Sequence, residues 1–404
     1  MKVLIVSPCV NLPVPAVHGG AVSTLIEYLV KENEVERKMQ LTVLSIYDTE
    51  AEQKAKTYTQ TQFNFICPPK IVDWCDHMVD RVLSVGKKKK TEHQYFRKQY
   101  SLNHISRYMV EHDFDKVVFQ NSGYLLNVLS NRVIAEKYKG KLYYHLHNDI
   151  PNNISVKAVM QCKLLLISEY LKKHINEACG QDMSEQCTIV KNGFDCDRFA
   201  QKLPENEKLE LKRKVGIEPD KKIIMFAGRI APTKGILELT KAFKRLNRND
   251  IVLMVVGAHN FGTGQSSEFQ KRMEKQFAEL GKRVCFTGYV PYDEIWKYYK
   301  LADIAVLPSI WEEPAGLTMI EACAAGIPLI TTRSGGIPEY VPERDVLLLD
   351  KNEKLVNSLK DAIETVLNNM PIWKKSACSA QEYVKLKYCV PQYYETFWRG
   401  IGGN

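Results

Sequence analysis

The sequence lacks several features that would assign it to a common class of protein. No apolar run approaches the ~18 residues that a membrane-spanning helix needs, so an integral membrane protein is excluded. The eleven cysteines are an odd number and form no C-x-x-C pair, so neither a disulfide framework nor a zinc ribbon is expected. Residues 1–6 lack a signal-peptide cleavage region and predict a strand. We therefore expect a protein of the reducing cytosol.

Several catalytic patterns are also missing. The first predicted strand is followed by His18-Gly19-Gly20 on a long loop and not by G-x-G-x-x-G, which argues against a dinucleotide-dependent dehydrogenase. No Walker loop and no Ser/His/Asp arrangement can be read from the sequence. The cysteines are more typical of buried small hydrophobic residues than of nucleophiles.

The remaining composition is that of an ordinary globular protein. The 404 residues, 45% apolar and 25% charged, fit two domains of about 200 residues each. Strand-like runs alternate with helix-like periods, which predicts parallel α/β architecture. The predicted strands are residues 3–6, 41–46, 116–119, 142–146, 164–167 and 188–190, and then 223–227, 251–256, 284–287, 304–307, 328–331 and 346–349.

This order of elements predicts two doubly wound, Rossmann-like sheets that face a cleft, with the carboxyl ends of their strands toward it. We place an acceptor-side domain at residues 1–200 and a second, nucleotide-binding domain at 201–385. The Lys- and Glu-rich stretch 197–221 is interpreted as the linker. In the last segment, 386–404, four aromatic residues crowd into a short helix that begins near Pro391. We expect this helix to pack back on the first domain.

Positive charge is unevenly distributed along the chain. The net charge is +9, and residues 81–110 alone contain eight Lys or Arg against one acid, including the run Lys87–Lys90. Such a cluster indicates an anionic membrane surface, a lipid phosphate or a nucleic acid. A solvated loop and helix face is the alternative interpretation. No nucleic-acid-binding motif accompanies the cluster, so no nucleic acid partner is expected.

A basic loop follows the first strand of the second domain. It reads Gly228-Arg229-Ile230-Ala231-Pro232-Thr233-Lys234-Gly235 and precedes a predicted helix. The carboxyl end of a strand and the positive end of a helix dipole together favour an anion, and Arg and Lys both bind phosphate oxygens. The loop therefore predicts a diphosphate site, with an ordinary basic surface loop as the alternative.

A second loop, residues 308–322, follows the strand at 304–307. Pro314 is typical of a helix start, which would place Glu313 at the mouth of the helix and Glu321 about 12 Å along its axis. Carboxylates at that distance cannot share a proton, but they can bind hydroxyl groups at the two ends of an extended ligand. Phosphates would then lie near the free backbone N–H groups of residues 315–318. This layout suits a nucleotide-sugar, although a single Glu is more often a capping or surface residue.

At this point the sequence resembles the retaining family-4 glycosyltransferases of GT-B fold, of the bacterial surface-polysaccharide type. The resemblance is carried by the loop ending in Lys234-Gly235, by Glu313-x7-Glu321 and by Ser334-Gly335-Gly336-Ile337-Pro338-Glu339. It extends to His18-Gly19-Gly20, to residues 166–171, and to Lys191-Asn192-Gly193-Phe194-Asp195 with Phe199. Each piece is weak alone, but their order and spacing cover nearly the whole chain.

The resemblance implies a role for each matching residue. The implied donor-binding residues are Gly19, Gly20, Gly228, Arg229, Lys234, Gly288, Tyr289, Val290, Glu313, Ala315, Gly316, Leu317 and Glu321. Arg229 and Lys234 would bind the diphosphate, while Glu313 would bind the sugar and Glu321 the ribose. Glu313, His147, Arg229 and Lys234 would be catalytic, His147 being preferred to its neighbour His145. The segment Gly288–Val290 would contact the base.

The implied activity is transfer of a hexose or N-acetylhexosamine from a UDP-sugar to a saccharide acceptor, which we expect to be lipid-linked, without metal or cofactor. Asp195-Cys196-Asp197 has the D-x-D form that binds a metal in another glycosyltransferase fold, but here it is interpreted as structural. A non-catalytic GT-B partner subunit and a GT-B epimerase remain as alternatives. A phosphorylase would need a pyridoxal site, and none is evident in the sequence. The expected location is the cytoplasm, as a peripheral protein of the inner membrane face.

Overall fold

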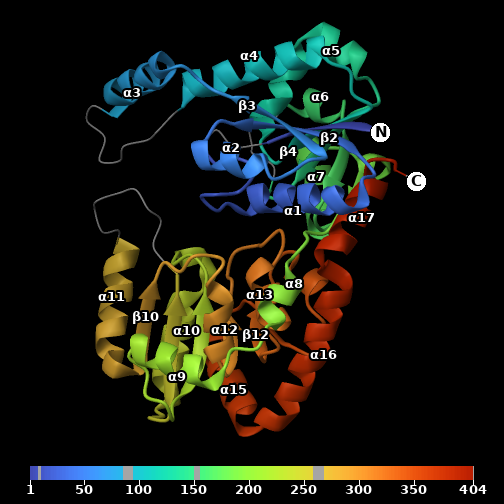
Figure 1. Cartoon of the computed structure of the whole chain (residues 1–404). Helices are drawn as coiled ribbons and strands as arrows, with labels where there is room; N and C mark the ends of the chain where they lie inside the picture. The colour runs from blue at the N-terminus through green and yellow to red at the C-terminus, as the bar shows by residue number, and fades with distance from the viewer. Residues whose placement is uncertain (8–10, 85–93, 150–154, 258–267, 404) are drawn as a thin grey trace. The chain divides into compact units, whose positions relative to one another are not determined.

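The computed structural model describes residues 1–7, 11–84, 94–149, 155–257 and 268–403 (Figure 1). The chain forms two compact units, one of Met1–Gly193 with Val390–Asn404 and one of Phe194–Cys389. Each unit has its own parallel sheet between helices, which confirms the predicted α/β class with two Rossmann-like domains.

The first unit contains a seven-stranded sheet in the order β3-β2-β1-β4-β5-β6-β7, with all neighbouring strands parallel. Its strands are β1 (Lys2–Val6), β2 (Gln40–Ile46), β3 (Thr61–Ile66), β4 (Lys116–Gln120), β5 (Leu142–Leu146), β6 (Lys163–Leu166) and β7 (Cys187–Ile189). Its helices before the chain leaves the unit are α1 (Ala21–Glu36), α2 (Thr49–Ala55), α3 (Lys70–Ser84), α4 (Tyr95–Glu111), η1 (Gly123–Ser130), α5 (Arg132–Lys137), α6 (Val156–Val159), α7 (Glu169–Cys179) and η2 (Ser184–Gln186). The strand order reverses between β1 and β4, which is where ligands bind in doubly wound sheets.

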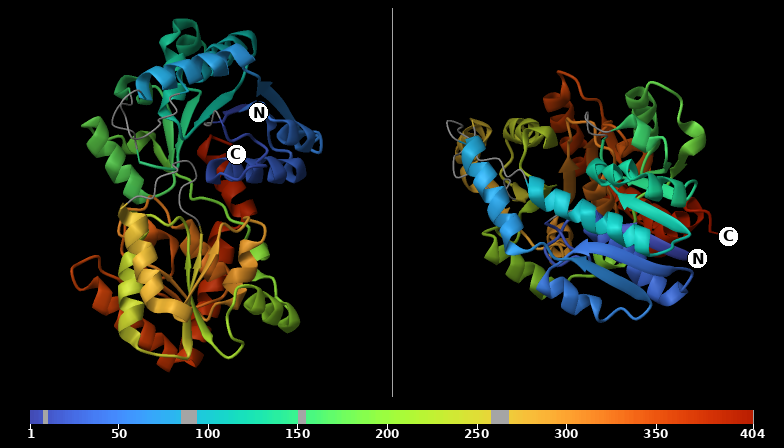
Figure 2. Two further views of the ribbon diagram at one scale, coloured as in Figure 1. Left: turned by 90° about the vertical axis from the view of Figure 1, so that its left-hand side faces the viewer. Right: turned by 90° about the horizontal axis from the view of Figure 1, so that it is seen from above.

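The last helix of the chain, α17 (Val390–Gly400), belongs to the first unit and lies beside α1 (Figures 1 and 2). Its aromatic residues Tyr393, Tyr394, Phe397 and Trp398 are buried in the core of that unit. The Tyr394 hydroxyl donates to Asn33 Oδ1 of α1 at 2.7 Å. The predicted return of the C-terminal helix to the first domain is therefore confirmed.

The second unit contains a six-stranded parallel sheet in the order β10-β9-β8-β11-β12-β13. Its strands are β8 (Lys222–Ala227), β9 (Ile251–Val256), β10 (Val284–Gly288), β11 (Ile304–Leu307), β12 (Leu329–Thr332) and β13 (Leu347–Leu349). Its helices are α8 (Cys196–Ala200), α9 (Glu205–Lys214), η3 (Pro232–Lys234), α10 (Ile236–Leu246), α11 (Glu268–Leu280), η4 (Gly281–Arg283), α12 (Ile295–Leu301), α13 (Leu317–Ala324), α14 (Ile337–Tyr340), α15 (Leu355–Asn368) and α16 (Met370–Tyr388). Here the order reverses between β8 and β11.

The stretch 197–221 differs from the predicted linker, because most of it is helical and packs in the second unit. Helix α8 buries Phe199 completely in the core of this unit. Helix α9 follows, and its Lys and Glu residues favour a helix while leaving it solvated. The charge-rich composition was interpreted as a linker, whereas Phe199 fixes the segment to the core.

Candidate active site

The two predicted ligand loops of the second unit meet at the point where its strand order reverses. The loop after β8 and the loop after β11 are joined through the carbonyl of Thr233. This oxygen accepts the backbone N–H of Ile310 at 3.0 Å and of Trp311 at 3.2 Å, and the Ser309 hydroxyl at 3.3 Å. The sheet therefore brings together two loops that are about 75 residues apart in the sequence, at the edge where ligands bind in such folds.

Lys234 and Glu313 form an ion pair between these loops. The Lys234 ammonium contacts Glu313 Oε1, and the Ser309 hydroxyl donates to the same oxygen at 2.9 Å. Glu313 is 8% exposed, so its carboxylate is held in one place by a cation and a hydroxyl. The Lys234 ammonium also lies 6.0 Å from the centre of the Trp311 ring. The pair places a cation and an anion side by side at the strand ends.

Glycines allow the loops to approach this closely. Gly228 ends β8 with a φ of +135°, and the exposed side chain of Arg229 follows it. Gly235 has a φ of +68°, and a Cβ there would lie 1.8 Å from the carbonyl oxygen of Pro308. Only glycine fits this position, because any side chain would force the two loops apart.

The segment Ser334-Gly335-Gly336 supports Glu313 from the next strand. The Gly336 N–H donates to the Glu313 carbonyl at 2.7 Å. A Cβ on Gly335, whose φ is +55°, would lie 2.2 Å from that carbonyl oxygen. This glycine motif of the resemblance therefore fixes the backbone of the acidic residue.

Helix α13 begins later than the sequence predicted. It starts at Leu317 with Gly316 as its N-cap, so Pro314 precedes the helix and the eight residues from Glu313 to Glu321 are not all helical. The estimate of 12 Å along one axis was therefore wrong, because non-helical backbone joins Glu313 to the helix. The Met319 and Ile320 N–H groups donate to the Gly316 carbonyl at 3.1 and 3.0 Å. The donors at the helix start are therefore the N–H groups of Leu317 and Thr318, next to half-buried Ala315.

Glu321 lies inside α13 and is buried, with 6% exposure. Burial raises the pKa of its carboxyl to about 7, while the Tyr299 hydroxyl, which donates to Oε2 at 2.8 Å, acts in the opposite direction. Tyr299 comes from α12, 22 residues earlier, and no local pattern in the sequence indicated it. In this structure Glu321 is therefore committed to an internal hydrogen bond.

The segment expected to contact a nucleobase lies at the end of β10. Gly288 has a φ of +73°, and its carbonyl accepts the Gly257 N–H at 3.0 Å. Tyr289 is 62% exposed, and Val290 packs against the core of the second unit. These residues share the carboxyl edge of the sheet with the Lys234–Glu313 pair, two strands from β8.

In the first unit, His147 directly follows β5. It is 7% exposed, and its Nδ1 and Nε2 lie 3.0 Å from Asn192 Oδ1 and 3.1 Å from Gln120 Oε1. Burial lowers the pKa of His147 to about 4, so the imidazole is neutral near pH 7. A neutral ring has one N–H, so one of the two amides must turn its NH₂ group toward the ring. The ring of His145 lies 4.1 Å away, centre to centre.

Gly19 and Gly20 precede α1, with φ angles of +78° and +99°, and Gly20 is the N-cap of that helix. The chain before them is fixed by side chains. The Ala16 N–H donates to Glu27 Oε2 at 2.8 Å, and His18 Nε2 lies 2.9 Å from Asp48 Oδ2. The glycine pair is thus held at the switch point of the first sheet.

The D-x-D segment has structural contacts. Asp195 caps α8 by accepting the Arg198 N–H at 3.1 Å, and Asp197 lies 3.1 Å from the Lys385 ammonium. Among the described residues, no group of three or more His, Cys, Asp or Glu could hold a metal ion.

Three further findings concern the sequence expectations. The run Lys87–Lys90 lies outside the described residues. Within the described ranges, no helix is long and apolar enough to cross a membrane. The cysteines in those ranges are free thiols.

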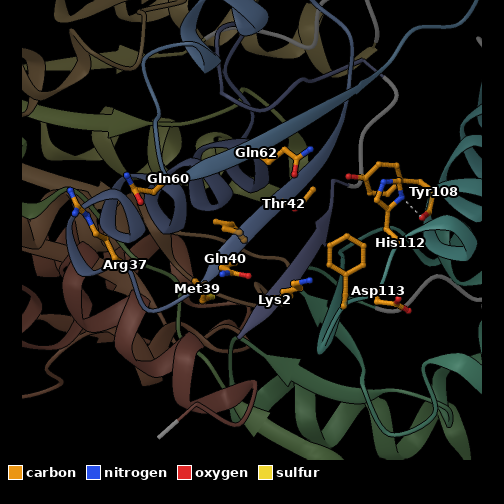
Figure 3. A pocket seen from close by; sticks show the side chains of 12 residues that line it. Lys2, Arg37, Met39, Gln40, Thr42, Gln60, Gln62, Tyr108, His112 and Asp113 are labelled. Carbon is orange, nitrogen blue, oxygen red and sulfur yellow. Dashed lines mark hydrogen bonds between the residues drawn. The ribbon is translucent and has the colours of Figure 1, made fainter.

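A cavity of about 470 Å³ lies at the opposite, amino-terminal edge of the first sheet (Figure 3). It is lined by the starts of β1 and β2, with Lys2 and Gln40, and by His112, whose Nδ1 bonds to the Tyr108 carbonyl at 3.0 Å. None of the candidate residues lines it, so it is separate from the candidate site.

Comparison with known proteins gives matches to a family, to individual proteins and to solved structures. Residues 207–383 match the family described as glycosyl transferases group 1. The YtcC protein of Bacillus subtilis strain 168, a glycosyltransferase by its name, is 26% identical over 381 residues, which cover 93% of this chain and 86% of that protein. A lipopolysaccharide 1,2-N-acetylglucosaminetransferase of Salmonella typhimurium strain LT2 is 31% identical over 238 residues, 56% of this chain and 59% of that protein.

Solved structures resemble the whole chain. A glycosyltransferase of Rickettsia africae matches with a TM-score of 0.75 at 18% identity, covering 100% of this chain and 99% of the other. HepE of Anabaena in complex with UDP-glucose matches with a TM-score of 0.72 at 19% identity, covering 99% and 98%. These likenesses show that the fold is GT-B.

Proposed function

We propose, because residues 207–383 match the family of glycosyl transferases group 1, that the protein is a metal-independent retaining glycosyltransferase. It would move a hexose or N-acetylhexosamine from a UDP-sugar to a saccharide acceptor. The observation that carries the proposal is the Lys234–Glu313 pair, where the strand order of the second sheet reverses. Its two loops also carry Arg229 and lead into α13.

The donor would lie along the carboxyl edge of the second sheet. Arg229, Lys234 and the first N–H groups of α13 supply positive charge and donors for a diphosphate. The fixed carboxylate of Glu313 would accept hydroxyl groups of the sugar, and Glu321 those of the ribose. For the latter contact, Tyr299 donates to Oε2 of Glu321, so Oε1 would accept the ribose hydroxyl while that hydrogen bond is kept. The base would lie near Tyr289.

The reaction breaks the bond between the anomeric carbon of the sugar and a phosphate oxygen. Negative charge grows on the leaving diphosphate, and Lys234 and Arg229 stabilise it in place of a metal ion. The acceptor hydroxyl attacks the face from which the diphosphate departs, and its proton passes to a phosphate oxygen. The configuration of the anomeric carbon is thereby kept, and no protein nucleophile is needed. On the first unit, His147 and Gly19-Gly20 would serve the transferred sugar and the acceptor.

The choice of donor and acceptor draws on the relatives. HepE is described in complex with UDP-glucose, and the Salmonella relative is named as an N-acetylglucosaminetransferase of lipopolysaccharide. We infer a UDP-sugar donor, a lipid-linked saccharide acceptor and a place in bacterial cell-surface polysaccharide synthesis. The enzyme would work in the cytoplasm, at the inner face of the membrane.

A panel of UDP-, GDP- and ADP-sugars tests the proposal by calorimetric binding and by slow donor hydrolysis in excess EDTA. We expect one UDP-sugar to bind and to be hydrolysed, with both signals reduced in Arg229→Ala. Binding without hydrolysis or transfer would favour the non-catalytic partner subunit. Isomerisation of the free nucleotide-sugar would favour the epimerase.

A further inference from the structure

Helix α3 exposes a row of four large apolar side chains. Ile71, Trp74, Met78 and Val82 are 60%, 57%, 40% and 69% exposed. In a helix with 3.6 residues per turn, these four positions fall within an arc of roughly 80°. We call them the α3 stripe. A surface helix normally buries such a stripe, so its exposure indicates a partner.

The polar face of α3 is the one that attaches it to the protein. Asp73 lies 3.4 Å from the Arg97 guanidinium, and Asp76 accepts the backbone N–H groups of Phe96 at 2.8 Å and Arg97 at 3.0 Å. On a helical wheel these acids lie opposite the stripe. Helix α3 therefore packs on α4 by its carboxylates and projects beyond the sheet of the first unit (Figure 1). Within the ranges that the structure describes, its stripe stays exposed.

Positive charge flanks the stripe. Lys70 and Arg81 fall next to Trp74 on the wheel, within roughly 40° of it. The long side chain of Lys70 can extend toward an anionic surface while the neighbouring apolar groups insert. The acids on the far face are engaged by α4, and the sequence from Arg81 to Val110 adds a net charge of +7. A binding partner with an apolar interior and an anionic surface would match the α3 stripe and the positive charge beside it.

We propose that α3 docks on an anionic lipid bilayer, with the α3 stripe inserted at the boundary of headgroups and acyl chains. A Trp beside basic residues suits this boundary, because its ring is apolar and its N–H can reach water or headgroups. A second copy of the chain suits it less, since a symmetric contact would bring both basic flanks together. This proposal extends the lipid-linked acceptor of the proposed function, but it is tested without any transfer reaction.

Co-sedimentation with vesicles of phosphatidylcholine, alone or with phosphatidylglycerol, provides the first test. We expect the wild type to bind the anionic vesicles. The double variant Ile71→Ser/Trp74→Ser should have a partition coefficient lower by about tenfold or more, because binding strength follows the apolar area that inserts. Ile372→Ser is the matched control, since Ile372 is 64% exposed on α16 of the other unit. This control should bind as the wild type does.

Trp74 gives a second, local readout. Brominated lipids quench a tryptophan that enters the acyl region, so wild-type fluorescence should fall when they replace ordinary lipids. Trp74→Phe should still bind these vesicles but lose most of that quenching. This pair of results locates the contact at α3 and not elsewhere on the chain.

Salt separates the stripe from the basic run. Lys87–Lys90 replaced by Gln should weaken binding mainly at low salt, whereas the α3 variant should stay weak at high salt. UDP-sugar affinity should be the same in both variants and the wild type. If the wild type does not bind any UDP-sugar, the proposed function fails, but the vesicle experiment still tests the membrane proposal. Equal vesicle binding by the wild type and Ile71→Ser/Trp74→Ser would overturn the proposal. So would a wild-type dimer in solution that this variant dissociates.

Discussion

At the scale of single residues, the candidate site depends on charges that are held close together. Lys234 and Glu313 neutralise each other, and a donor diphosphate would share the same cation. Arg229 is exposed, so its charge costs little to maintain and is available to a ligand. The site is therefore electrostatically balanced before any ligand binds.

We predict that Arg229→Ala and Lys234→Ala each lower the rate of transfer by roughly 10²–10³, because each removes a charge-assisted contact to the leaving diphosphate. Both variants should stay folded. Initial rates at saturating donor, with circular dichroism as the check on folding, provide the measurement. Normal turnover by either variant would contradict the assignment of the diphosphate site.

A second prediction concerns His147 and pH. Its pKa is about 4 in the folded protein, against about 6.5 in an unfolded chain. Below pH 6.5 the unfolded state binds a proton that the native state does not, so the free energy of unfolding falls as pH is lowered toward 4. Between pH 6.5 and 5 this histidine should account for about 2 kcal/mol. Urea unfolding across that range should show a smaller pH dependence in His147→Gln, and an unchanged slope would contradict the prediction.

The residue types of the candidate site could be predicted, but their partners could not. Arg229, Lys234 and Glu313 stood out because they follow strands in Gly- and Pro-containing loops. Tyr299 beside Glu321, and Gln120 beside His147, come from other elements and carry no local pattern. Such partners depend on how elements pack, which a single sequence does not display.

At the scale of elements, close contact between the two ligand loops requires Gly235. We predict that Gly235→Ala weakens UDP binding at least about tenfold, because the new Cβ would overlap the Pro308 carbonyl and displace the loop. Gly216→Ala is the matched control: its φ of +73° is similar, but no atom lies within 4 Å of the added Cβ. The control should lose only about 1 kcal/mol of stability and keep its affinity. Equal affinities of the two variants, measured by calorimetry, would show that the loop contact is not needed.

Helix α17 gives a prediction about stability. Phe397 is completely buried in the first unit, so Phe397→Ala should lower the free energy of unfolding by roughly 3–5 kcal/mol. Leu386→Ala, at a position 73% exposed on α16, should leave it nearly unchanged. Thermal unfolding of the two variants compares them directly. A small effect at Phe397 would mean that the helix does not contribute to the core of that unit.

Buried elements were predictable and edge elements were not. The central strands are continuous apolar runs, and all of them were predicted. Strand β3, Thr61–Ile66, lies at the sheet edge with alternating polar residues and was missed. The start of α13 was placed too early because Pro314, although suited to a helix start, here lies in the preceding loop.

At the scale of the whole molecule, the two sheets share one topology. Each reverses its strand order once, and each carries glycines at the loop after its first strand: Gly19-Gly20 after β1 and Gly228 after β8. The alternation of strand-like and helix-like segments predicted two doubly wound sheets. The aromatic face of α17 predicted that this helix packs on a domain, because a free tail would not carry such a face, but the face alone did not say which domain.

The most direct test of the central claim is the anomeric configuration of the transferred sugar, followed by proton NMR during a reaction in excess EDTA. With an α-linked UDP-sugar donor, the account predicts an α-linked product formed at full rate without metal, since Arg229 and Lys234 stabilise the leaving diphosphate. A β-linked product, or a reaction that resumes only when Mg²⁺ or Mn²⁺ is added, would contradict it.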